Sequence, residues 1–143
     1  MVFQGGKAGK YLDSFCRRLQ VQRSDKFHGF WVRGTGVLYC WGNRVKANGK
    51  YPRWDWKNLL GRKEQRTHFK YVLLHGPKHG YVKERFFFIP RKKVEARART
   101  DPALKKRCNI AADPLKPWGE RTPWVYKFEI KSVSGLRRAL RKL

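Results

Sequence analysis

Acidic residues are scarce in this sequence. The chain has 143 residues, of which 35 are Lys or Arg and only 10 are Asp or Glu, so its formal net charge is +25 at pH 7. Basic residues outnumber acidic ones in residues 1–50, 51–100 and 101–143 alike. No part of the chain is therefore electrically neutral. Positive charge at this density opposes compaction through self-repulsion, which indicates a polyanionic partner. Nucleic acid is the partner that we expect, and an acidic protein or an anionic membrane surface is the alternative.

Long apolar runs are also missing. The longest candidates are the short segments 71–74 and 86–89, whereas a membrane-spanning helix needs about 18 or more apolar residues. We therefore expect a soluble chain with no membrane partner. A protein that lies on a membrane surface is a weaker alternative, because the C-terminal segment is basic and amphipathic.

Paired cysteines and catalytic motifs are absent as well. Cys16, Cys40 and Cys108 are widely spaced, which favours a reducing compartment and predicts neither a disulfide framework nor a metal site. The sequence contains no phosphate-binding loop, serine elbow or His-Glu-x-x-His pair, and its acids are scattered. We expect no enzyme, no cofactor and no small-molecule substrate. The alternative is a metal-free ribonuclease that uses His75 or His79 as general acid and base.

Apolar and aromatic residues are abundant enough to build a core. Hydrophobic residues make up 41% of the chain and aromatic residues 15%, unlike the composition of a disordered chain. Periodicity and turn residues predict an α+β fold in one domain over residues 1–143, with a small antiparallel sheet of two hairpins and a fifth strand, flanked by amphipathic helices. The predicted hairpins pair 29–33 with 37–41 and 69–74 with 81–89, and the predicted fifth strand covers 124–130. The predicted helices cover 10–22, 91–99, a segment that begins at Asp101-Pro102 and ends at Pro114, and the C-terminal segment after Ser134.

Residues 42–66 have no sustained period and are rich in Lys, Arg, Gly and Asn, so we expect a long basic loop or extension there. Its cations alternate with aromatic rings, a combination suited to RNA phosphates and unstacked bases. Trp54 is a candidate stacking platform, although Trp54 and Trp56 are alternatively core residues on one face of a strand. The candidate RNA-binding residues of this segment are Arg44, Lys46, Lys50, Arg53, Trp54, Lys57, Arg62, Lys63 and Arg66.

Two further basic clusters are candidate RNA contacts. The first follows the second hairpin and comprises Arg91, Lys92, Lys93 and Arg97. Cations at the start of a helix oppose its dipole, which favours an external anion over a solvated surface or a nuclear localisation patch. The second comprises Arg137, Arg138, Arg141 and Lys142, opposite a leucine stripe that can dock on the domain or on a neighbouring protein.

A short, very basic chain with a small folded body, a cationic extension over 42–66 and basic ends resembles a ribosomal protein. Its high Trp and Phe content is similar to that of lineage-specific proteins of mitochondrial ribosomes. The resemblance covers the whole chain in composition and organisation. It implies a structural role, with contacts to ribosomal RNA and to neighbouring ribosomal proteins.

The location that we expect is the mitochondrial matrix, with the cytosol as the alternative. The first twelve residues contain no acid and include Lys7 and Lys10, and an amphipathic stretch with Arg17 and Arg18 follows, a pattern typical of mitochondrial transit segments. The main functional alternative is a free RNA-binding or RNA-processing accessory factor.

Overall fold

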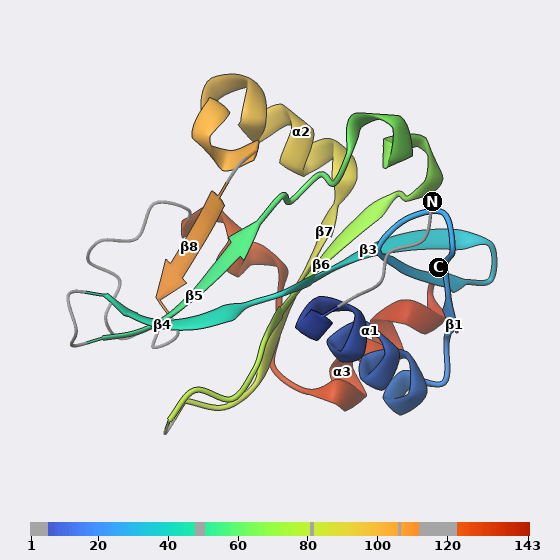
Figure 1. Cartoon of the computed structure of the whole chain (residues 1–143), viewed down its shortest axis with the longest axis horizontal. Coiled ribbons are helices and arrows are strands. Elements are labelled where there is room, and N and C mark those ends of the chain that lie inside the picture. The colour runs from blue at the N-terminus through green and yellow to red at the C-terminus, as the bar shows by residue number, and fades with distance from the viewer. Residues whose placement is uncertain (1–5, 48–50, 81, 106, 112–122) are drawn as a thin grey trace.

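A computed structural model describes residues 6–47, 51–80, 82–105, 107–111 and 123–143 of the chain (Figure 1). It contains helices and two β-sheets, which confirms the predicted α+β fold class. The helices are α1 (Gly6–Leu19), α2 (Arg91–Thr100) and α3 (Val133–Arg141), with the short 3-10 helices η1 (Lys63–His68), η2 (Pro102–Lys105) and η3 (Pro123–Phe128). The strands are β1 (Gln22–Arg23), β2 (Gly29–Val32), β3 (Thr35–Trp41), β4 (Asn43–Ala47), β5 (Tyr51–Lys57), β6 (Tyr71–Gly76), β7 (Arg85–Pro90), β8 (Arg107–Ala111) and β9 (Glu129–Ile130).

The larger sheet has six strands in the order β1-β2-β3-β6-β7-β9. Both predicted hairpins are confirmed, as β2 with β3 and as β6 with β7. The first hairpin turns at Arg33 and Gly34, whose φ angles of 48° and 83° match the positive values that a two-residue hairpin turn requires. Because β3 and β6 pair in parallel, the sheet is mixed rather than purely antiparallel. A parallel pair needs a crossover connection, and residues 42–70 supply it.

Alternation along the central strands divides the core between the two faces of this sheet. Tyr39 and Leu73 lie on the face covered by α1 and α3, whereas Leu38, Val72 and Leu74 lie on the face covered by the smaller sheet and α2. Figure 1 shows α1 and α3 next to each other, with α2 on the opposite side of the sheet. Successive side chains of a strand point to opposite faces of the sheet. A strand with apolar residues at consecutive positions therefore contributes to the core on both faces.

The smaller sheet consists of β4, β5 and β8, all antiparallel. Its presence contradicts the expectation of a long loop over 42–66, because β4 and β5 both lie in this segment. Trp54 and Trp56 are fully buried and alternate with Asp55 and Lys57, which is the period of two that a half-buried strand requires. At Gly42 the chain passes from β3 of the larger sheet to β4 of the smaller one, and a Cβ there would lie 3.0 Å from both the His75 carbonyl oxygen and the Trp56 ring.

Three other predicted elements differ in the structure. The segment after Asp101 forms only the short helix η2 and then β8, so the predicted helix up to Pro114 is wrong within the described residues; the backbone of β8 pairs with β5 instead. Most of the predicted fifth strand is the helix η3, and only Glu129–Ile130 pairs with β7. Helix α3 is capped by Ser132 rather than Ser134, since the Ser132 hydroxyl accepts a 3.0 Å hydrogen bond from the Gly135 N–H. Helices α1 and α2 confirm the other two helix predictions with slightly different bounds.

Candidate nucleic-acid interface

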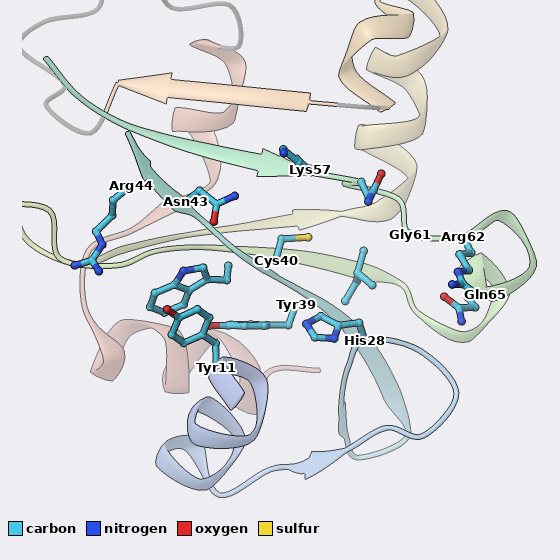
Figure 2. A pocket seen from close by; sticks show the side chains of 13 residues that line it. Tyr11, His28, Tyr39, Cys40, Asn43, Arg44, Lys57, Gly61, Arg62 and Gln65 are labelled. Carbon is cyan, nitrogen blue, oxygen red and sulfur yellow. The ribbon is translucent and has the colours of Figure 1, made fainter. Parts of the chain in front are cut away.

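A groove of about 730 Å³ lies where α1, β3, β4 and the segment after β5 meet (Figure 2). Leu38 and Cys40 of β3 contribute apolar surface to its lining, and α1 contributes Tyr11. Its volume lies within the range of about 300–1,000 Å³ that is common for ligand-binding clefts. The groove can therefore hold a molecule or a polymer segment of moderate size.

The described residues that line the groove carry positive charge and include no acid. Arg44, Lys57 and Arg62 are exposed cations on its rim. In Figure 2, Arg44 lies at one end, Arg62 at the other end, and Lys57 between them along the side opposite Tyr11. A concave site lined by charge of one sign concentrates its field and attracts ligands of the opposite sign, here anions.

His28 also lines the groove and adds no charge at neutral pH. The pKa of His28 is lowered to about 4, chiefly by burial and to a smaller extent by the nearby Arg23 guanidinium, while Asp13 acts in the opposite direction. The imidazole is therefore neutral at pH 7 and offers one ring nitrogen as a donor and the other as an acceptor. Electrostatic attraction in the groove comes from the Arg and Lys side chains alone.

A turn after β5 brings two of these cations to the same rim. Asn58 and Gly61 have φ angles of 56° and 62°, and the Gly61 N–H donates a 2.9 Å hydrogen bond to the Asn58 carbonyl. Left-handed backbone conformations suit Asn and Gly better than other residues. The Asn-Leu-Leu-Gly sequence thus reverses the chain between Lys57 and Arg62, while Leu59 and Leu60 are buried in the core.

Two aromatic rings form a stacked pair beside the cations. The centroids of Tyr11 and Trp41 are 3.7 Å apart with an interplanar angle of 12°, and both residues are half-buried and line the groove. Trp41 also meets His75 edge-on at 5.1 Å. The pair is thus held between helix α1 and the sheet, with aromatic surface at the groove.

Some of the predicted RNA-binding residues reach this groove and others do not. Arg44, Lys57 and Arg62 line it, and Lys63 is exposed nearby in sequence. Lys50 lies outside the described residues, as does the side chain of Lys46.

Trp54 and Arg53 correct the sequence interpretation. Trp54 has no exposed surface, and its indole N–H donates a 2.8 Å hydrogen bond to the Pro77 carbonyl, so its ring cannot stack on a base; the core alternative is right. Arg53 is only 7% exposed, too little for a phosphate contact of the kind expected. Both residues are buried, because they belong to a strand of a packed sheet rather than to a solvated loop.

Two arginines near α2 make contacts within the protein. Arg91 donates to the backbone carbonyls of Arg66 and Phe69 and pairs with Glu95 at 3.3 Å, which fixes the start of α2 against the preceding segment. These contacts supply an internal reason for the Arg91 cation. Arg66 is half-buried, and its Nε is a buried atom without a hydrogen-bond partner among the described residues.

The remaining predicted cations of α2 and α3 are at the surface. Lys92, Lys93 and Arg97 of α2 are exposed, and Arg97 lies 5.4 Å above the ring of Trp124. In α3, Leu136 and Leu140 are buried, as the leucine stripe predicts. The exposed cations at this end of the chain are Arg137, Arg138, Arg141 and Lys142.

The histidines of the nuclease alternative do not form a paired site. His75 is only 3% exposed, and both of its ring nitrogens have partners, the Tyr39 hydroxyl at 2.6 Å and the Glu84 carboxylate at 2.5 Å. The backbone of His79 pairs with Val82 in an isolated bridge. His75 is thus a core residue that a substrate cannot reach in this structure.

Sequence reasoning missed Tyr11, His28, Trp41, Asn43 and Asn58 as groove residues. No spacing rule connects them, because they come from α1, the segment before β2, the end of β3, and two points along the crossover. Only the turn at 58–61 carried a local signal, in its Asn and Gly. Cationic residues were easier to find because charge alone marks them.

Within the described part of the chain, no helix is long and apolar enough to cross a bilayer. The same residues bring no three His, Cys, Asp or Glu side chains together as a metal-binding group. Comparison of the chain with protein-family models, with curated proteins and with solved structures found no match.

Proposed function

We propose that this chain is an RNA-binding structural constituent of a ribosome, and more specifically of a mitochondrial ribosome. The observation that carries the proposal is the groove rimmed by Arg44, Lys57 and Arg62, whose described lining residues include no acid. Cations gathered around one concave surface attract ligands that carry many negative charges, so an external polyanion fits the groove.

The ion pairs of the protein strengthen this reasoning. Four acids of the described residues pair with arginine: Asp13 with Arg23, Glu84 with Arg18, Glu95 with Arg91, and Glu129 with Arg85. Even if every acid of the chain neutralised one cation, 25 positive charges would remain. Phosphates of RNA lower the repulsion between these charges, and the release of their counterions drives the association.

The exposed cations of α2 and α3 extend the interaction beyond the groove. They lie on helices whose other faces are buried, so the body of the domain holds them in place. RNA shape, read through backbone contacts at several rigid sites, supplies specificity in this arrangement. The free accessory factor remains the competing function, and it differs in whether the chain stays on a ribosomal subunit.

A sedimentation experiment tests the proposal. The tagged full chain is expressed in its own cells, and ribosomal subunits are washed in high salt and separated on a sucrose gradient. We expect the chain to stay with one subunit. Recovery of the chain only at the top of the gradient, together with RNA binding, would support the accessory factor instead.

A charge-reversal variant connects this result to the groove. The variant Arg44→Glu/Lys57→Glu/Arg62→Glu should fail to enter the particle while its circular dichroism spectrum is retained. The matched control Lys26→Glu/Lys127→Glu/Lys131→Glu reverses three other exposed cations, none of which lines the groove. Equal incorporation of both variants would overturn the role of the groove.

A further inference from the structure

We infer that the groove binds an unpaired nucleotide of single-stranded RNA, with the base against the Tyr11–Trp41 pair and the flanking phosphates at Arg44, Lys57 and Arg62. This inference rests on the proposed function and names the form of RNA that the groove takes. The geometry of the aromatic pair, the shape of the groove and the chemistry of its polar lining each support it.

The aromatic pair has the properties of a stacking platform. Tyr11 and Trp41 are parallel, half-buried and directed to the groove, whereas Trp54 and Trp56 are completely buried. Tyr11 belongs to a helix whose next residue, Leu12, is fully buried, so the platform is fixed before the ligand arrives. Bases stack on such rings regardless of their identity, because every base has a π face.

The concave shape favours a single strand over a duplex. An A-form duplex offers phosphates and 2′-hydroxyl groups on a convex surface and keeps its bases stacked inside. A groove of about 730 Å³ that is enclosed by a helix, a strand and a turn can surround an extruded nucleotide but not a whole duplex. The aromatic pair inside it would have no role in binding to a duplex backbone.

The polar lining fits the two halves of a nucleotide. Asn43, Asn58 and Gln65 offer amide donors and acceptors, which can bond the edge of a base. The three cations stand around the rim, where Figure 2 shows Arg44 and Arg62 at opposite ends of the groove. Phosphates on the two sides of one nucleotide can therefore each find a cation while the base enters between them.

The experiment compares RNA with and without bases. Fluorescence anisotropy measures the binding of the full chain to three labelled probes at one fixed salt concentration: an adenine ribo-octamer, an octamer of the same length with abasic sugars, and an RNA hairpin of equal charge. We expect the adenine octamer to bind roughly 5- to 160-fold more tightly than the abasic one, the range that corresponds to stacking of one base on an aromatic ring. Equal affinity for both octamers would mean that the groove holds phosphates alone, which overturns the inference and leaves the proposed function standing.

Variants of Tyr11 locate the effect. Tyr11→Leu keeps an apolar side chain against Trp41 but removes the π face, so it should abolish the preference for the adenine octamer, whereas Tyr11→Phe should retain it. The control Tyr71→Leu removes another half-buried tyrosine, which stacks on Phe88, and should leave the preference unchanged. A preference that survives in folded Tyr11→Leu would overturn the inference.

Adenosine monophosphate distinguishes a strand from a free nucleotide. It presents the same base and phosphate chemistry without neighbouring phosphates. We expect it to compete at least 100-fold more weakly than the octamer, since it engages fewer cations. Competition at equal concentration would make the groove a site for free nucleotides and would overturn the assignment to single-stranded RNA.

Discussion

The Tyr39 hydroxyl lies 2.6 Å from Nδ1 of His75, on the face of the larger sheet that packs against α1. Burial raises the pKa of Tyr39, so the phenol stays protonated and donates to the imidazole. Burial also lowers the pKa of His75 although Glu84 opposes the change, so the ring is neutral, accepts at Nδ1 and donates from Nε2 to Glu84 at 2.5 Å. Arg18 of α1 then donates to both oxygens of Glu84, at 2.9 and 2.5 Å.

These four side chains form a continuous chain of hydrogen bonds between α1, β3, β6 and the segment before β7. Tyr39 donates to His75, and both His75 and Arg18 donate to the ionised carboxylate of Glu84. Such a network stabilises a core only when each buried polar group has a partner. It fixes α1 on the sheet, and Tyr11 of α1 forms one wall of the groove.

The first prediction concerns the Tyr39 hydroxyl. Tyr39→Phe keeps the ring but leaves Nδ1 of the buried His75 without its donor. We expect the free energy of unfolding to fall by about 1–3 kcal/mol, the cost of one unsatisfied buried polar group. Urea unfolding followed by circular dichroism measures the change.

Tyr71→Phe is the matched control for this variant. It removes a hydroxyl from a half-buried ring that stacks on Phe88, outside the hydrogen-bonded chain. Its stability should stay close to that of the wild type. An equal loss of unfolding free energy in both variants would show that the hydrogen bond between Tyr39 and His75 contributes no more to stability than the Tyr71 hydroxyl does.

The second prediction concerns Glu84 and acid. Burial raises the pKa of Glu84, but hydrogen bonds from Arg18 and His75 outweigh this effect and lower it from 4.5 to about 2. Because the unfolded chain binds a proton more readily, the stabilisation by Glu84 is present above pH 4.5 and is lost as the pH falls towards 2. This loss amounts to about 1–2 kcal/mol, since solvent screens the partly exposed carboxylate.

Glu84→Gln should flatten the curve of unfolding free energy against pH between 4.5 and 2. The amide retains an oxygen that accepts from His75, so the difference between wild type and Glu84→Gln reports the effect of the negative charge. Glu129→Gln removes a carboxylate that pairs with Arg85 at the β7–β9 edge and serves as the control. Parallel curves for wild type and Glu84→Gln would refute the role of this carboxylate in acid stability.

The third prediction separates the two kinds of aromatic residue. Trp54→Phe keeps an aromatic ring in the core but leaves the buried Pro77 carbonyl without its donor. The free energy of unfolding should fall by about 1–3 kcal/mol while the affinity for single-stranded RNA is unchanged. Thermal unfolding and anisotropy measure the two quantities, and a weakened RNA affinity in the folded variant would restore Trp54 as a contact.

Local patterns in the sequence were sufficient for the hairpins and for the helices α1 and α2. The hairpin at Arg33 and Gly34 has a glycine turn between β-branched and aromatic runs, and Leu12, Phe15, Cys16 and Leu19 repeat at helical spacing. Both signals are local. The hairpin depends on the geometry of its turn, and the helix depends on apolar residues that repeat within a few positions of one another. The fold class follows from such elements taken together.

Long-range packing decided the elements that the sequence did not predict. The glycines and cations of 42–66 look like a loop, but Trp54 and Trp56 lie against Gly76 and Gly42, where a Cβ would come within 2.7 and 3.0 Å of the respective rings. Those contacts join segments that are more than ten residues apart, and no local period shows them. The same limit applies to the groove, whose cations were predicted from charge but whose aromatic pair comes from α1 and β3.

The fourth prediction concerns the salt dependence of RNA binding. For single-stranded RNA, each phosphate neutralised by a Lys or Arg contributes about 0.7 to the slope of log affinity against log salt concentration. Arg44→Gln/Lys57→Gln/Arg62→Gln should therefore reduce the magnitude of the slope by about 2, in addition to weakening binding at every salt concentration. Anisotropy titrations with the adenine octamer between 50 and 300 mM salt measure the slope. The control Lys26→Gln/Lys127→Gln/Lys131→Gln removes the same charge from exposed positions outside the groove lining, so it lowers the overall positive potential equally. If the two triple variants lost slope equally, net charge alone would explain RNA binding, and the arrangement of cations around the groove would have no part in it.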